Sequence, residues 1–121
     1  MRKTVATAVA VLLTVLAAPV LAGINGTWNF VFDTEGGERR ASITLKADGG
    51  KLTGKVAGDS GETEITGSVE GDKIHIEFPY YSEEAGVKAV VKIDGTVSGD
   101  KISGEWEFDI YSGTFEASKA E

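Results

Sequence analysis

The residues whose types could do chemistry are few, and one stretch holds most of them. The segment Pro79–Gly86 carries Tyr80, Tyr81, Glu83 and Glu84. Loops of unusual length on a small scaffold often carry function. Tyrosines there could cover the mouth of a cavity or form a contact surface, because the ring is apolar and the hydroxyl is polar. A flexible connector with one buried tyrosine is the alternative interpretation.

The remaining polar residues do not form a set suited to catalysis or metal binding. His75 is the sole histidine, the chain has no cysteine, and carboxylates do not cluster around His75 in a suitable spacing. Glu105, Glu107 and Asp109 fall on the outward face of a predicted strand, as in a solvated charge ladder. Paired carboxylates for glycoside hydrolysis need a cleft, which such a face lacks. With neither a nucleophile–base pair nor a phosphate loop, we predict no enzyme, no metal and no cofactor.

A repeated hairpin design positions these residues. Between Ile93 and Phe108, apolar and polar residues alternate on both sides of Gly99-Asp100, which is a strong hairpin signal. The same plan recurs at 65–74, and a third copy starts at Leu52. Extended along the chain, the alternation predicts eight strands, at 27–33, 39–47, 51–57, 62–70, 73–78, 87–98, 101–109 and 114–119.

The predicted turns set the order and register of these strands. Every connection except 79–86 fits a two-residue turn, and such turns fix register. The resulting registers place one inward residue of each strand in a row, namely Trp28, Leu45, Leu52, Val69, Ile74, Val91, Phe108 and Ala117. The next row holds Phe30, Ile43, Gly54, Gly67, Ile76, Ala89, Ile110 and Phe115.

An open sheet this regular would leave two bare edges, which closure removes. The sequence therefore predicts an all-β fold, an eight-stranded antiparallel up-and-down β-barrel, with a two-sheet sandwich of the same meander order as the alternative. In these registers the inward glycines Gly54 and Gly67 face each other across neighbouring strands. They could leave a small apolar cavity, or they could permit the strand coiling that closure requires.

Residues 1–22 are predicted to be a secretory signal peptide. Arg2 and Lys3 precede an apolar run, and small residues end at Ala22, where we expect cleavage. A membrane anchor is the alternative. Residues 23–121 then form one β-barrel domain of a secreted or periplasmic protein, without a segment that could insert into a membrane.

Without Arg2 and Lys3, 10 basic residues stand against 19 acidic ones, so the net charge is −9. This charge argues against nucleic acid and anionic membranes as partners.

Two short motifs resemble a known group of barrels. The sequence Gly26-Thr27-Trp28 at the start of the first strand is similar to the opening of the lipocalin and avidin-like barrels of the calycin group. The stretch 48–54 resembles the early hairpins of avidin-like proteins most closely. The resemblance implies a small, often apolar, ligand inside the barrel. The chain is shorter, lacks the C-terminal helix of lipocalins, and has none of the inward polar groups with which avidins hold biotin, so biotin binding is not carried over.

These observations locate a candidate ligand-binding site. The loop 79–86 lies at the barrel end opposite Trp28, which is expected to plug its own end. We therefore expect a small apolar ligand at the mouth under this loop, with Phe32 and Phe78 on the inner wall and Tyr80 and Tyr81 above them. A structural or protein-interaction module with a filled barrel core is the competing interpretation.

Overall fold

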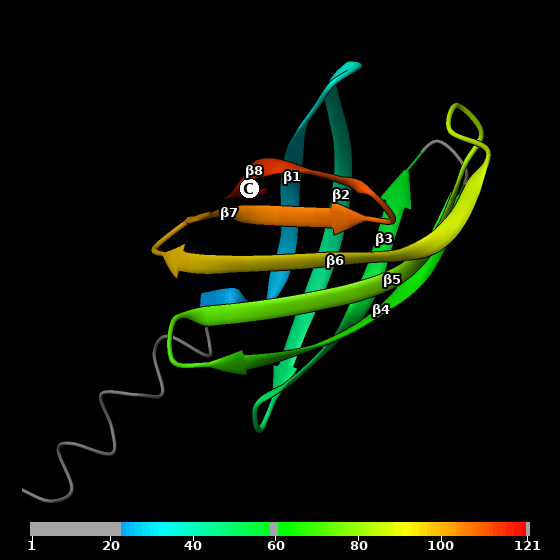
Figure 1. Cartoon of the computed structure of the whole chain (residues 1–121). Coiled ribbons are helices and arrows are strands. Elements are labelled where there is room, and N and C mark those ends of the chain that lie inside the picture. The colour runs from blue at the N-terminus through cyan, green and yellow to red at the C-terminus, as the bar shows by residue number, and fades with distance from the viewer. Residues whose placement is uncertain (1–22, 59–60, 121) are drawn as a thin grey trace, which may run out of the picture.

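The computed structural model describes residues 23–58 and 61–120, so the predicted signal peptide lies outside the described residues. Eight strands follow one another along the chain (Figure 1): β1 Gly26–Thr34, β2 Gly37–Asp48, β3 Lys51–Gly58, β4 Gly61–Glu70, β5 Lys73–Ser82, β6 Val87–Ser98, β7 Lys101–Phe108 and β8 Tyr111–Lys119. Each strand pairs antiparallel with the next, and β1 pairs with β8. The predicted all-β, eight-stranded, antiparallel up-and-down barrel is confirmed, and the sandwich is not formed.

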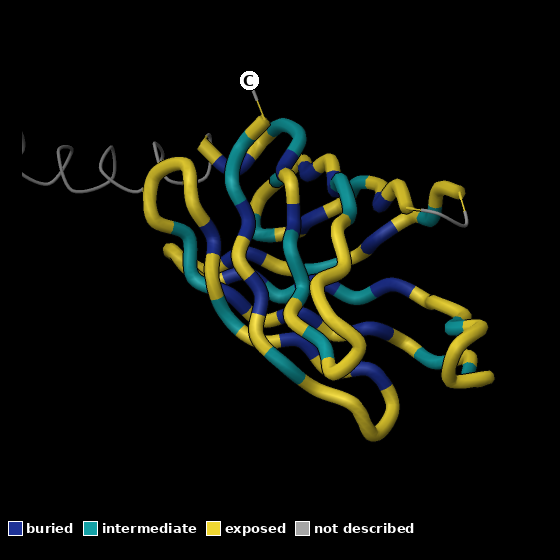
Figure 2. The backbone as a smooth tube through the Cα atoms, turned by 90° about the horizontal axis from the view of Figure 1, so that it is seen from above, coloured by how far each residue is buried: buried dark blue, intermediate teal, exposed yellow. Residues whose placement is uncertain are grey.

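The hydrophobic core consists mainly of inward-pointing residues from every strand. Trp28, Phe30, Ile43, Ile76 and Ile93 are each 0% exposed. Buried and exposed positions alternate along the strands, as Figure 2 shows, because successive side chains point to opposite faces. Over residues 23–58 and 61–120, no polar or charged residue is buried.

Two of the predicted registers are correct, and both follow a Gly-Asp turn. Val69 pairs with Ile74 across Gly71-Asp72, and Val91 pairs with Phe108 across Gly99-Asp100. The other registers are wrong by an even number of residues. Trp28, for example, pairs with Ile43 and not with Leu45, because the turn lies at 35–36. An even shift leaves each side chain on its predicted face, so the core was predicted almost completely despite these errors.

The largest register error concerns the last hairpin. The turn lies at 109–110, not at 112–113, so β8 begins at Tyr111 and Phe108 pairs with Tyr111. Ile110, predicted to point inward, is 84% exposed in this turn. Asp109 supplies the positive φ, of 57°, that this tight turn needs. Asp109-Ile110 is a weaker turn signal than Ser112-Gly113, which misled the prediction.

The long loop between the fifth and sixth strands is also a wrong prediction. Strand β5 continues through Ser82, and the turn holds only residues 83–86. Pro79 pairs with Val90 inside the strand. Proline is tolerated there because the pairing of β4 with β5 has already ended at Thr66–Glu77, so this part of β5 is an edge.

The inward glycines serve close backbone packing. Gly54 pairs with Ile65 and Gly67 with Leu52, so the two glycines do not face each other. A methyl group added to Gly54 would overlap the carbonyl oxygen of Thr44. Neighbouring backbone therefore occupies this space, and the coiling interpretation holds rather than the cavity.

Strand pairing around the barrel is uneven, and this shapes the mouth. Strands β1 and β8 pair only from Trp28–Lys119 to Phe32–Phe115, and β4 and β5 only from Glu70–Lys73 to Thr66–Glu77. Both short seams lie at the end of the barrel where Trp28 lies. At the other end, two hairpin tips project past their neighbours (Figure 1). We name them the β1–β2 arm, residues 33–41, and the β5–β6 arm, residues 78–90.

Candidate ligand-binding site

The barrel end at the start of β1 is filled. Trp28 is fully buried, and its indole Nε1 donates a hydrogen bond of 2.9 Å to the carbonyl oxygen of Ile24. Ile24 is itself only 1% exposed. The Nζ atom of Lys119 lies 5.6 Å from the centroid of the Trp28 ring. Trp28 thus plugs this end, as the sequence predicted.

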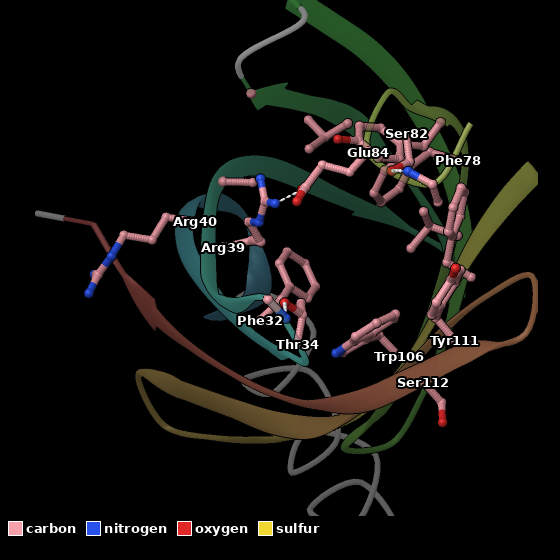
Figure 3. A pocket seen from close by; sticks show the side chains of 18 of the residues that line it. Phe32, Thr34, Arg39, Arg40, Phe78, Ser82, Glu84, Trp106, Tyr111 and Ser112 are labelled. Atoms are coloured by element: carbon pink, nitrogen blue, oxygen red, sulfur yellow. Dashed lines mark hydrogen bonds and ion pairs between the residues drawn. The ribbon is translucent and has the colours of Figure 1, made fainter. Parts of the chain in front are cut away.

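The opposite end holds an open cavity of about 530 Å³, within the size range of small-molecule sites. Its inner wall is apolar and includes Val56, Phe78, Val91, Trp106 and Phe108 (Figure 3). These five side chains are 6–8% exposed, so they are buried by the barrel yet reach the cavity.

Stacked aromatic rings lie at the base of the cavity near β1. The Phe30 ring stacks on Phe32 and on Phe115, with centroid separations of 5.7 and 5.3 Å. Phe32 lines the cavity, while Phe30 is fully buried beneath it. This stack separates the cavity from the filled part of the barrel.

Three of the four predicted site residues line this cavity, and one does not. Phe32, Phe78 and Tyr80 contribute to its wall. The Tyr80 ring packs edge-on against Phe108, with centroids 5.6 Å apart. Tyr81 is not among the lining residues and is 55% exposed. Because residue 81 belongs to a strand and not to a loop, its side chain alternates to the outer face.

Trp106 is the most informative residue that the sequence interpretation missed. Its indole Nε1 donates a hydrogen bond of 3.2 Å to the carbonyl oxygen of Asp33. This bond joins β7 to β1 beyond Phe32–Phe115, the last pair of β1 with β8. Trp106 therefore fills the gap beyond Phe32–Phe115, where β1 and β8 no longer pair, and it also lines the cavity. The correctly predicted β6–β7 register already placed Trp106 inward, opposite Ile93. The wrong β7–β8 register, however, gave no sign that β1 and β8 stop pairing near Trp106.

The rim of the cavity carries charge. Arg39, on the β1–β2 arm, forms an ion pair with Glu84, in the turn of the β5–β6 arm (Figure 3). Their side chains are 50% and 70% exposed. Arg40, the next residue, also borders the cavity, but its side chain points away from Arg39 and Glu84 and pairs with Glu38 (Figure 3). The Arg39–Glu84 ion pair thus connects the two arms across the opening. The sequence interpretation noted Glu84 but not Arg39, since nothing in the sequence alone places Arg39 opposite this turn.

A second polar cluster lies on the outer face of the barrel. The Nδ1 atom of His75 lies 2.7 Å from Asp94 Oδ1, and its Nε2 atom lies 2.7 Å from Glu77 Oε2. These hydrogen bonds, with Glu77 first and Asp94 second, raise the pKa of His75 above its ordinary value. The sequence interpretation did not place Asp94 beside His75, because its β5–β6 register was wrong; the observed register pairs the two residues directly.

In the described ranges, no group of three or more histidine, cysteine, aspartate and glutamate residues could hold a metal ion. Among those same residues, no helix has the length and hydropathy needed to cross a bilayer.

Comparison of the sequence with protein-family models finds no match, and no curated protein matches it significantly. The closed eight-stranded barrel is compatible with a calycin-like fold.

Proposed function

We propose that this protein is a secreted or periplasmic, non-catalytic carrier or receptor that binds a small apolar ligand in the mouth cavity. The observation that supports this best is the asymmetry of the barrel interior. One end is plugged by Trp28 and Ile24, whereas the other holds a cavity of about 530 Å³ with an apolar inner wall. Binding of an apolar molecule inside an eight-stranded barrel is also what the lipocalin or avidin-like resemblance implies.

Other features agree with this proposal. The apolar run and small residues of 1–22 support export. The acidic balance of the mature chain supports a role without nucleic acid or anionic membranes as partners. Around the cavity, the described residues offer hydroxyl groups and charged groups (Glu35, Arg39, Arg40 and Glu84), not a nucleophile with its base, which supports binding without chemistry.

A neutral fluorescent probe such as N-phenyl-1-naphthylamine tests the proposal. We expect saturable binding to the wild type, weakened roughly two- to fivefold by Tyr80→Ser, since each lost aromatic contact contributes about 0.5–1 kcal/mol. Tyr81→Ser is the matched control: the same substitution one residue away, on the outer face, should leave the affinity unchanged. No saturable binding by the wild type would overturn the proposal.

One observation favours an interaction module as the second candidate. The large hydrophobic side chains that are exposed in the described structure belong to the β5–β6 arm, to the β7–β8 turn or to the first residue of β8: Tyr80, Tyr81, Val90, Ile110 and Tyr111. Apolar side chains gathered at one end of a protein commonly mark a contact surface. If the probe does not bind, this surface becomes the better candidate for the functional site.

A further inference from the structure

We propose that the mouth cavity takes a single-chain amphiphile with a compact anionic headgroup, and that Arg39 holds this headgroup where the Glu84 carboxylate now lies. The inference rests on the proposed function and specifies the ligand class of the same site.

The cavity changes from apolar to polar between its wall and its rim. The wall residues, such as Phe78 and Trp106, present apolar surface. Hydroxyl groups and charges belong to residues at the strand ends and turns, including Thr34, Ser82 and Arg39. A ligand that satisfies both regions has an apolar tail that enters the barrel and a polar head that stays at the rim, because a buried head would lose its hydrogen bonds to water.

The carboxylate of Glu84 already lies at the rim, beside Arg39, where the headgroup of the ligand would lie. One oxygen of Glu84 pairs with Arg39, and the other, Oε2, lies 4.0 Å from where a Cβ atom would stand on Gly36. The Glu84 carboxylate thus reaches from the β5–β6 arm across the mouth to the β1–β2 turn. Arginine presents a planar fork of donors that matches a carboxylate, so a ligand carboxylate can replace that of Glu84 without rearranging Arg39.

The internal pair is weak enough to be exchanged. Half or more of each side chain is exposed, so water screens the attraction between Arg39 and Glu84. A ligand carboxylate would arrive with an apolar tail whose burial adds a favourable contribution that Glu84 lacks. Glu84 therefore acts as a competitor of the ligand headgroup, and displacing it also frees the β5–β6 arm.

The test compares dodecanoate with dodecanol, two ligands that share one tail. Affinities are measured by displacement of the neutral probe at about pH 8, where a carboxylic acid is ionised, and below micelle-forming concentrations. Arg39→Gln should weaken dodecanoate binding roughly three- to tenfold, and Glu84→Gln should strengthen it roughly two- to fivefold. Dodecanol binding should change less than about twofold in both variants. Arg40→Gln is the charge-matched control: Arg40 also borders the cavity, but it pairs with Glu38 and not with Glu84, so dodecanoate binding should change less than about twofold.

The opposite signs of the two variants separate this inference from a structural role of the ion pair. If the pair only held the arms together, Arg39→Gln and Glu84→Gln would shift both ligands in the same direction, and the inference would be overturned. It would also be overturned if dodecyltrimethylammonium bound better than dodecanoate and lost affinity in Glu84→Gln. If either of these two results is obtained but dodecanol and the neutral probe still bind, the proposed function stands. If none of these compounds binds, both the inference and the proposed function are overturned.

Discussion

At the scale of single residues, Gly54 shows how little room the barrel wall leaves. Its φ of +154° is at the edge of the range that favours glycine, and an added methyl group would overlap the Thr44 carbonyl oxygen. The β2 and β3 backbones can approach closely at this point because residue 54 has no side chain. The sequence pattern identified an inward glycine here, but only the three-dimensional register shows which backbone atom it approaches.

Gly54→Ala should therefore destabilise the protein. We expect a loss of about 1–3 kcal/mol in the free energy of unfolding, since strand β2 must move to admit the methyl group. Gly58→Ala is the matched control in the same strand, because no atom of the described residues, its chain neighbours apart, lies within 4 Å of its added methyl group. Urea unfolding measures both, and equal midpoints for the two variants would contradict the close approach at Gly54.

His75 is the second residue whose surroundings give a measurable expectation. Both of its ring nitrogens lie 2.7 Å from a carboxylate, so only the doubly protonated ring can donate to both. Charged groups on the neighbouring strands also face this cluster: Lys92 pairs with Glu77, and Glu105 pairs with Asp94, while β4 contributes the uncharged Ser68 opposite His75.

Because the folded-state pKa of His75 is raised above about 6.5, the cluster stabilises the protein fully below that pH. This contribution should disappear as pH rises through the folded-state pKa. A pH titration of the His75 ring signals by NMR gives that pKa directly, and a value at or below that of an unfolded histidine would contradict the prediction. Wild type and His75→Gln should also converge in urea midpoint as pH rises.

At the scale of elements, turn chemistry explains which parts of the fold could be predicted. Gly71-Asp72 and Gly99-Asp100 lie at the observed turns, with the glycine in positive φ, and their hairpins have the predicted registers. At Gly36-Gly37 and at 48–50, two or three turn-forming residues are adjacent, so the turn can be placed at more than one position. Several strand registers then keep the apolar residues on the inward face, and the sequence alone does not select one of them.

The extension of β5 was missed for a related reason. Pro79 is a strong breaker signal, but it ends a strand only where its missing N–H is needed by a neighbour. Beyond Glu77 strand β5 has no pairing on the β4 side. Tyr80 and Tyr81 consequently became strand residues on opposite faces, which is why one lines the cavity and the other does not.

The β5–β6 arm should exchange its amide hydrogens faster than the barrel body. Residues 79–90 pair only with each other, since β6 pairs with β7 from Val91 onwards, and a lone two-stranded ribbon is marginally stable in water. Hydrogen exchange read by mass spectrometry should show weak protection of the arm beside strong protection of 91–98. Protection of the arm equal to that of 91–98 would mean that contacts other than strand pairing hold it.

At the scale of the whole molecule, the position of the cavity was predictable and its walls were not. The order of strands and turns already placed Trp28 at one end and the segment 79–86 at the other. The wall depends on side chains from non-neighbouring strands, such as Trp106 reaching Asp33, and on where the strand pairs stop. Neither follows from alternation, because a hydrophobic pattern does not say how far two strands stay together.

The short pairings of β1 with β8 and of β4 with β5 have a consequence for the width of the barrel opening. In a barrel that is closed along its full length, strand number sets the interior width, and eight strands leave just enough room for their own side chains. Here strand number sets the width only at the base, where β1 meets β8 and β4 meets β5. The width of the opening at the rim depends on how far the two hairpins spread apart, so changes in hairpin length or tip charge would alter this width without adding a strand or disturbing the core.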